Sequence, residues 1–505
     1  MPRDVDDDFT ALPLHALADA ALDRARELGA SHADVRIERG RSLMVRLRDG
    51  ALEGANDTTD LGLSVRVVVD GTWGFAARVD LDVDAAVAAA GSAIELAKVS
   101  RPVNSEPVEL AAEPVHANAT WVSAYDIDPF TVGDTEIVEL LGSRCRAVLD
   151  VDGIDHVDAA VLAVKEQKFY ADLAGSSTTQ QRVRLHADVT AVAIDKDTGA
   201  FETMRTVAPP VGRGWEYVLG ASHGGWDWDA ELAELPERLI ERLHAPSVEP
   251  GTYDLVIHPS NLWLTIHESV GHATELDRAL GYEANYAGTT FATFDQLGSL
   301  QYGSAAMTVT GDRIVEHGLA TVGYDDEGVA AQQWDLVRDG TLVGYQLDRR
   351  MASLKGFDRS NGCAYADSAG HVPVQRMPNV SLAAAQDGPS TEELIGRVER
   401  GLFVVGDKSW SIDMQRFNFQ FTAQRFFRIE GGRLAGQVKD AAYQANTLKF
   451  WNSLEAVGGA QTYVLGGAFN CGKAQPGQVA AVSHGCPTSL FRQINVLNTV
   501  QESGR

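Results

Sequence analysis

The chain has 505 residues, 45% of them hydrophobic, so it is long enough for a large packed core and for two or three domains. Its 43 basic and 70 acidic side chains give a formal net charge of −27, which disfavours nucleic acid and anionic lipid as partners. No segment approaches the 18 apolar residues of a membrane helix, and the N-terminal sequence has no apolar signal core. We therefore expect a cytoplasmic protein that binds neither nucleic acid nor membranes.

The first hundred residues predict a small α+β module. Residues 11–28 and 83–97 show the apolar periodicity of helices, whereas residues 33–78 between them alternate apolar and polar side chains as antiparallel strands do. Residues 101–119 contain three prolines and little periodicity, which indicates a linker. We therefore predict a first domain over residues 1–100, followed by that linker.

The same order of elements recurs after the linker. Residues 135–149 predict a helix, and residues 156–207 contain alternating segments that predict further strands. Glycines and prolines between residues 209 and 225 indicate the next boundary. This pattern predicts a second α+β module over residues 120–225, related to the first.

The remaining residues, 226–505, predict a larger and mostly β domain. After a helix at residues 230–243 and a strand at residues 253–257, a second helix begins near Ser260, and Gly281 is a suitable stop. Beyond this glycine, short alternating segments and turn signals predict strands and hairpins. The whole pattern places the chain in the α+β class, with N-terminal antiparallel modules followed by a mostly β domain that carries the second helix.

The segment at residues 267–272, HESVGH, contains two histidines and a glutamate within this second helix. Zinc binds neutral imidazole nitrogen, and a catalytic zinc has three protein ligands and an open position for water. A glutamate beside that water can take its proton during hydrolysis. The segment therefore indicates a metal site in which His267 and His272 are ligands and Glu268 is the general base.

The spacing of the two histidines requires a distorted helix. Residues five apart on a regular α-helix are separated by about 140° around its axis, too far for one ion to bind both side chains. A π-bulge or a locally unwound turn would bring His267 and His272 together, and such distortions are frequent at functional sites. Gly271 lowers the cost of the distortion because glycine has a poor helix propensity.

Two other interpretations need no distortion. An ordinary helix could carry His267 and His272 as unrelated polar residues. Alternatively, Glu268, His272 and Glu275, which share one flank of a regular helix, could bind the metal, although this arrangement leaves no obvious base. Both interpretations remain open at the level of the spacing.

The candidates for a third ligand include four cysteines, Cys145, Cys363, Cys471 and Cys486. They form no C-x-x-C pair, which argues against a structural four-cysteine zinc site, and Cys145 lies in a predicted helix as a core residue. Cys471 lies in a glycine-rich N-C-G-K loop, where Lys473 could lower the pKa of its thiol. Cys471 is therefore either a metal ligand or a buried loop thiol.

Four segments of the C-terminal half, taken in order, resemble the TldD/PmbA metallopeptidases, and specifically the TldD-like members that carry the metal motif. They are HESVGH at residues 267–272, YDDEG at 324–328, RMPN at 376–379, and CGK at 471–473 followed by Gly477 and Gln478. Together they are far more specific than the first segment alone.

This resemblance implies a zinc peptidase in which His267, His272 and Cys471 bind Zn²⁺ and Glu268 is the base. The YDDEG and RMPN segments are then expected to contact the substrate or to support the metal ligands. The resemblance also implies a dimer, either a homodimer or a heterodimer with a homologue that lacks the metal motif.

One departure from the family pattern lies close to the third ligand. Residues 474–476 insert Ala-Gln-Pro after the CGK segment, so the local geometry at Cys471 could differ from that of the family. Cys486 and His484 are the alternative ligands if Cys471 does not reach the metal.

These observations predict a zinc-dependent peptidase that cleaves unfolded or disordered peptides. A mostly β domain can bind an extended peptide as an added strand at an exposed sheet edge, with little sequence preference. The rival hypothesis is a non-catalytic peptide-binding subunit, because the family also contains motif-less members that partner the metal-bearing ones. A hydrolase with a serine or cysteine nucleophile is the third hypothesis, and chelator-insensitive cleavage would favour it.

Overall fold

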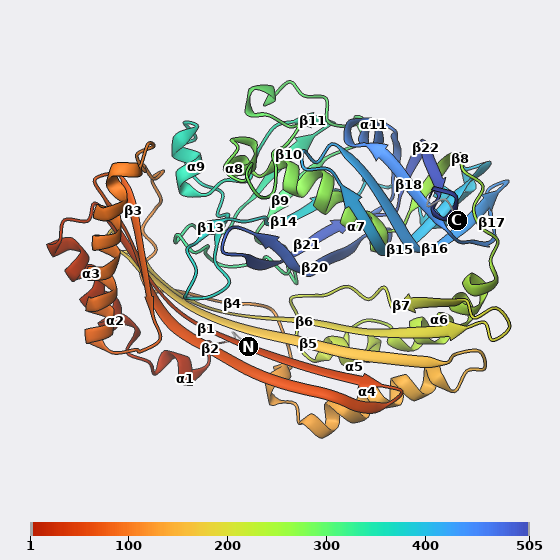
Figure 1. Ribbon diagram of the computed structural model, residues 1–505, viewed down its shortest axis with the longest axis horizontal. Helices are drawn as coiled ribbons and strands as arrows, with labels where there is room; N and C mark the ends of the chain where they lie inside the picture. Colours follow the sequence, from red (N-terminus) through yellow and green to blue (C-terminus); the bar gives the residue numbers. More distant parts are fainter. Residues whose placement is uncertain (1–3, 503–505) are drawn as a thin grey trace.

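A long, strongly curved sheet forms the N-terminal part of the structure, and the C-terminal part lies across its concave side (Figure 1). The computed structural model describes residues 4–502. The strands run in the order β3-β2-β1-β5-β6-β4, and β7 also pairs with β6. Their bounds are β1 (His32–Arg48), β2 (Ala51–Val69), β3 (Thr72–Arg78), β4 (Ala119–Val122), β5 (His156–Asp172), β6 (Ser177–Ile194) and β7 (Phe201–Arg205).

Two pairs of helices pack on the two ends of this sheet and bury separate cores (Figure 1). α2 (Leu14–Glu27) and α3 (Val83–Ser100) cover one end, while α4 (Asp134–Leu149) and α6 (Trp228–His244) cover the other. The face that α3 buries consists mainly of alanines, so the helix approaches the sheet closely. A Cβ at Gly74 of β3 would lie 1.9 Å from the Ala93 carbonyl oxygen, which explains the glycine at this contact.

The two segments predicted as N-terminal modules share one sheet. β1 pairs with β5 in antiparallel fashion from Asp34↔Asp172 to Arg48↔Asp158. β4, at the end of the predicted linker, adds a parallel strand beside β6. The residue boundaries predicted for the domains remain a prediction.

The C-terminal part is built on a closed ring of strands. β15, β8, β22, β18 and β16 pair in that order, and the additional β15–β16 pairing closes the ring, while β17 and β19 extend it. Aromatic side chains fill this part of the core, and the rings of Phe450 and Phe491 stack at 4.2 Å. The bounds are β8 (Gly251–Ile257), β15 (Arg400–Ile412), β16 (Asn418–Glu430), β17 (Arg433–Val438), β18 (Ala441–Asn446), β19 (Leu454–Val457) and β22 (Ser489–Asn498).

Smaller sheets lie between this ring and the N-terminal sheet (Figure 1). They comprise β9 (Val309–Asp312), β10 (Gln333–Arg338), β11 (Thr341–Leu342) and β14 (Asn379–Leu382), the pair β12 (Ala364–Tyr365) and β13 (Val374–Gln375), and the pair β20 (Val464–Lys473) and β21 (Gln478–Cys486). The C-terminal part also contains the short helices α7 (Pro259–Ile266), α8 (Leu276–Ala279), α9 (Arg349–Leu354), α10 (Thr391–Gly396), α11 (Thr447–Asn452) and α12 (Thr499–Glu502). Two further short helices, α1 (Asp7–Thr10) and α5 (Glu216–Leu219), belong to the N-terminal part. The predicted α+β class is confirmed. Within residues 4–502, no helix has the length and apolar character needed to span a membrane.

Candidate metal centre

The predicted helix is broken at the metal motif. α7 ends at Ile266, the next turn, His267–Gly271, is π-helical, and a 3-10 turn covers His272–Thr274. A π-turn hydrogen-bonds residues five apart, so it brings their side chains to the same face. The rings of His267 and His272 accordingly lie with their centroids 4.7 Å apart. The expected distortion is confirmed, and the interpretation of an ordinary helix is wrong.

Two imidazoles and one thiol converge beside this turn. Ligand atoms of His267, His272 and Cys471 all lie within 4.8 Å of one another, and Cys471 Sγ is 3.7 Å from His272 Nε2. All three side chains are buried. Cys471 lies in β20, beside an irregularity in its pairing with β21, and not in the expected loop. The structure thus brings together the three residues predicted as metal ligands.

The insertion at residues 474–476 lies in the turn between β20 and β21. The last ladder pair before the turn joins Lys473 to Gln478, and Cys471 is paired within the ladder. The additional residues therefore lengthen the turn and leave the strand that carries the thiol intact.

The alternative ligands make other contacts. Cys486 Sγ lies 3.8 Å from a backbone carbonyl oxygen, and His484 is hydrogen-bonded to the ring of His267. Glu275 bonds His272 Nδ1, the ring nitrogen opposite the one that faces the thiol. The ligand set with Glu268, His272 and Glu275 is therefore not the one that this geometry supports.

A chain of hydrogen bonds fixes the tautomer of His267. His484 Nδ1 lies 2.9 Å from the Val380 carbonyl oxygen, which can only accept, so this nitrogen carries the proton. His484 Nε2 is then an acceptor, and it lies 2.7 Å from His267 Nδ1, which donates to it. His267 Nε2 is therefore unprotonated and available to a metal.

The carboxylate of Glu275 fixes the tautomer of His272 in the same way. Its Oε2 lies 2.8 Å from His272 Nδ1, which must donate, so Nε2 keeps its lone pair on the side of Cys471. Burial lowers the pKa of both His267 and His272 well below the usual value, and neighbouring positive groups act in the same direction. Both rings are therefore neutral, as metal ligands must be.

Arg376, and not Lys473, is the principal cation near the thiol. Burial raises the pKa of Cys471 to about 11, and the Arg376 guanidinium is the main influence that opposes this rise. Arg376 also donates to the backbone carbonyl oxygen of Cys471. The ammonium of Lys473 instead bonds three buried carboxylates: Glu275 at 3.1 Å, Asp277 at 2.9 Å and Glu283 at 2.8 Å. Lys473 therefore supports the residue that orients His272.

Glu268 is buried and engaged by two side chains that the sequence did not indicate. Burial raises the pKa of its carboxyl group, whereas an ion pair with Arg416 and a hydrogen bond with Trp410 oppose the rise. Trp410 lies near the end of β15, and Arg416 lies in the turn between β15 and β16. No motif or spacing in the sequence connects this hairpin with Glu268, so only the tertiary structure reveals the contact.

The metal residues line a cleft between the N-terminal and C-terminal parts. This cavity of about 540 Å³ is lined by His267, Glu268, His272 and Cys471, by Trp410 and other residues of β15, and by much of β20. The N-terminal part contributes His186 and residues 205–210, at and after the end of β7, and α7 adds Ser260, Trp263 and Leu264. A substrate in this cleft would contact both parts of the chain.

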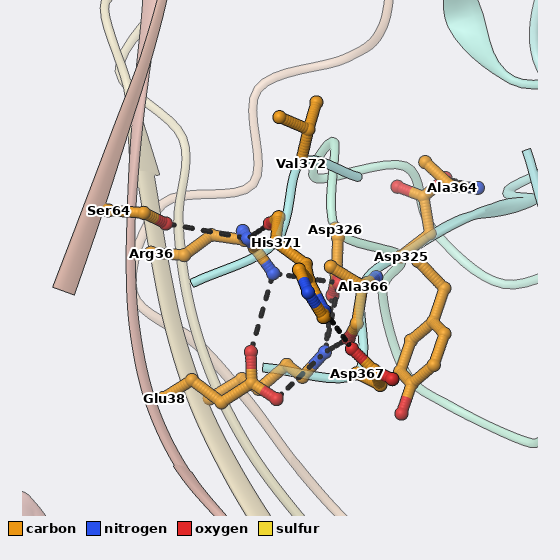
Figure 2. Close-up of polar contacts among 12 residues, drawn as sticks. Arg36, Glu38, Ser64, Asp325, Asp326, Ala364, Ala366, Asp367, His371 and Val372 are labelled. Carbon is orange, nitrogen blue, oxygen red and sulfur yellow. Dashed lines mark hydrogen bonds and ion pairs between the residues drawn. The ribbon is translucent and has the colours of Figure 1, made fainter. Parts of the chain in front are cut away.

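The YDDEG segment holds the N-terminal sheet against the C-terminal part (Figure 2). Asp326 forms ion pairs with Arg36 at 3.1 Å and with Lys168 at 2.9 Å, and Glu327 pairs with Arg66 at 3.0 Å. All of these side chains are buried. This role differs from the expected contact with substrate or with the metal ligands.

The RMPN segment contacts Cys471 and the turn that carries the two histidines. Arg376 contacts Cys471, and Met377 packs beneath the π-turn. A Cβ added to Gly271 would lie only 2.5 Å from Met377 Sδ. Gly271 therefore leaves room for the buried side chain of Met377, in addition to lowering the cost of the distorted turn.

A G-x-S-x-G segment follows α5. Residues 220–224, GASHG, match the spacing of the nucleophile elbow of α/β hydrolases. Residues 221–224, which include the serine, form an exposed turn after α5, whereas the elbow connects a strand to a helix. This segment therefore does not support the serine hydrolase hypothesis.

Comparisons with known proteins agree with this description. The model for the PmbA/TldA metallopeptidase C-terminal domain matches residues 250–498, and the model for PmbA/TldA metallopeptidase domain 1 matches residues 33–97. A metalloprotease of Methanothermobacter thermautotrophicus is 26% identical over 480 residues, which cover 93% of this chain and 96% of the relative. A zinc metalloprotease TldD homolog of Saccharolobus solfataricus is 22% identical over 490 residues, which cover 94% and 98%.

The fold is also shared with a solved structure. A putative modulator of a DNA gyrase from Thermotoga maritima superposes with a TM-score of 0.73 at 15% identity, over 95% of this chain and 99% of that one. At this identity the likeness concerns the fold alone. The family models and the full-length relatives show that the chain belongs to the TldD/PmbA family of metallopeptidases.

Proposed function

We propose that the protein is a zinc-dependent peptidase that cleaves unfolded or disordered peptides bound in an extended conformation. The observation that carries this proposal is the convergence of two neutral imidazoles, one thiol and a separate carboxylate, Glu268, on one cleft. Membership of a metallopeptidase family and the name of the Saccharolobus relative support it.

The set of donor atoms suits zinc. Zinc accepts nitrogen and sulfur ligands, and catalytic sites use three protein ligands and one open position. His267, His272 and Cys471 supply two nitrogens and one sulfur, and His484 and Glu275 hold the two imidazoles in the required tautomers. When bound, a zinc ion would supply Lewis acidity, which polarises the peptide carbonyl and lowers the pKa of a water molecule.

Glu268 is the residue to which we assign the proton transfers. Its side chain lines the same cleft as His267 and His272, and its Oε2 is held by Arg416. In this assignment the carboxylate accepts a proton from the attacking water and returns it to the amine nitrogen that leaves. The two histidines bind the metal through nitrogens other than those engaged by His484 and Glu275.

The outer edge of β20 suits an extended peptide. Among the described residues, β20 pairs with β21 and with no other strand, and residues 466–472 of β20 line the cleft. A peptide added along this edge would exchange backbone hydrogen bonds with it, which demands an extended conformation but little sequence preference. Unfolded or disordered chains meet that requirement.

We also propose that the protein acts in the cytoplasm, as a homodimer or as a heterodimer with a motif-less homologue. A reducing compartment suits a thiol ligand, and the family resemblance underlies the dimer. The competing proposal is a non-catalytic peptide-binding subunit. The complete set of candidate ligands together with Glu268 favours the enzyme.

Metal content and the Glu268→Gln variant test the proposal. Protein purified with zinc should hold near one zinc per chain and cleave an unfolded protein substrate, and a chelator should abolish this cleavage until zinc is restored. Glu268→Gln should keep the zinc and lose at least about 10²-fold in kcat. Full activity of this variant would refute the assignment of Glu268 as the general base. If the protein holds no zinc after purification in its presence, the peptide-binding subunit is favoured.

A further inference from the structure

A hairpin far away in the sequence delivers an arginine to the proposed base. Arg416, which lies between β15 and β16, forms an ion pair with Glu268, although 148 residues separate them. Both side chains are largely buried, at 15% and 8% exposure. A charge-assisted contact of this kind restricts the orientation of a carboxylate more strongly than a neutral hydrogen bond.

The hairpin is held rigidly at its own base. The carboxylate of Asp413 accepts hydrogen bonds from the backbone N–H groups of Gln415 at 3.1 Å, Phe417 at 2.8 Å and Asn418 at 3.0 Å. Such a ring of donors around one aspartate fixes the path of the turn. The guanidinium of Arg416 is therefore carried by a turn that has its own internal support.

Neighbouring segments anchor the tip of the hairpin. The N–H of Thr289 donates to the Met414 carbonyl at 3.0 Å, and the N–H of Phe291 donates to the Gln415 carbonyl at 3.0 Å. Thr447 Oγ1 donates to the Arg416 carbonyl at 2.7 Å. These bonds come from two segments outside the hairpin, and none of them uses the Arg416 side chain.

Arg416 itself has a backbone φ of +60°, in the left-handed region that side chains other than glycine seldom adopt. Such conformations persist when surrounding contacts impose them, and they are concentrated at functional sites. A glycine would relieve the strain but would remove the guanidinium from Glu268. The strained position thus coincides with the side chain that reaches the base.

We propose that Arg416 is a positioning residue for Glu268. It binds Oε2 of the carboxylate and so restricts the orientation of this group, which lines the cleft where a water molecule would be activated. The expected effect of Arg416 on kcat rests on the proposed peptidase function. The contact with Oε2 is itself independent of the reaction.

The alternative is an ion pair that only stabilises the hairpin. The contacts of Asp413, Thr289, Phe291 and Thr447 argue against it, because they hold the hairpin without the Arg416 side chain. The two interpretations predict different behaviour of Glu268 when the guanidinium is removed.

The test uses Arg416→Met, which keeps most of the apolar stem, Arg416→Lys, which keeps the charge, and Gln415→Ala as a control on the same hairpin. In the zinc-loaded protein, Arg416→Met should lower kcat by about 10²-fold with KM and zinc content unchanged, because a misplaced base costs turnover and not binding. Arg416→Lys should recover part of the loss, and Gln415→Ala should behave as wild type.

Crystal structures of the same variants give a readout that needs no activity. The Glu268 carboxylate should leave its position in Arg416→Met and keep it in Gln415→Ala. An unmoved carboxylate, or a kcat of Arg416→Met within twofold of wild type, would overturn the proposal. If Arg416→Met does not fold, the same two measurements on Arg416→Gln decide it. If the zinc-loaded wild type cleaves no peptide, the proposed function fails, and the position of Glu268 still decides the role of Arg416.

Discussion

His267 Nδ1 lies 2.7 Å from His484 Nε2, so one buried histidine orients another that is a candidate metal ligand. His484 in turn donates its own Nδ1 proton to a backbone carbonyl, and this bond fixes the tautomer of His484. The sequence offered His484 as an alternative ligand. In the structure, His484 instead orients the ring of His267.

Replacement of His484 should therefore weaken metal binding. His484→Leu removes the acceptor for the His267 Nδ1 proton, and we expect zinc affinity to fall by about 10- to 100-fold, as competition with a chelator would measure. His484→Gln retains an acceptor oxygen and should lose much less. Equal losses in both variants would mean that His484 binds the metal directly.

The contact between Gly271 and Met377 predicts energetic coupling. Gly271→Ala would place a Cβ 2.5 Å from Met377 Sδ in a packed core, and such overpacking costs about 1–3 kcal/mol of the free energy of unfolding. Met377→Ala alone should also destabilise the protein, but the double variant should lose less than the sum of both. Urea unfolding measures all four proteins, and strict additivity would contradict the contact.

Lys473 should be important for both stability and metal binding. Lys473→Met leaves Glu275, Asp277 and Glu283 without their shared cation, and breaking a buried ion pair costs about 3–5 kcal/mol. Zinc retention should also fall, because Glu275 orients His272. Lys98→Met, which removes only an exposed ion pair, is the control and should change the free energy of unfolding by less than about 1 kcal/mol. Equal effects of both variants would refute the prediction.

The buried ion pair between Asp34 and Arg66, within the N-terminal sheet, should lose its stabilising effect in acid. Burial raises the pKa of Asp34, but the Arg66 guanidinium and His32 outweigh this effect and lower it to about 2. A carboxyl group with a lowered pKa stabilises the fold above its ordinary pKa of about 3.9, and this contribution is lost as the pH falls through 2. Asp34→Asn should therefore cost about 2 kcal/mol at pH 5, and roughly 1 kcal/mol less at pH 3. A difference that is the same at both values, measured by urea unfolding, would contradict the assignment.

Local features of the fold and site could be predicted because they depend on neighbouring residues. If His267 and His272 bind one ion, their five-residue spacing predicts a break in the helix, since a regular turn cannot bring both rings together, and the structure contains a π-turn there. Alternating side chains likewise predicted the strands of residues 33–78 and 156–207. Cys471 was reached through the family resemblance, because nothing in its spacing connects it with the helix.

Contacts between distant segments could not be predicted from the sequence pattern. His484 lies 217 residues from His267, and Arg416 lies 148 residues from Glu268. Periodicity operates over a few turns or one strand, whereas these contacts depend on how separate sheets pack. The continuous sheet formed by β1 and β5 was missed for the same reason.

The amino-acid sequence alone determined which side chains could bind a metal, and that the helix must be distorted if His267 and His272 bind one ion, because donor chemistry and helix geometry are local properties. Only the tertiary structure decided that Lys473 supports Glu275, that Arg376 bonds the backbone of Cys471, and that Asp326 joins the two parts of the chain. Each of these roles depends on which buried charges meet, and a buried charge is stable only beside the partner that folding brings to it.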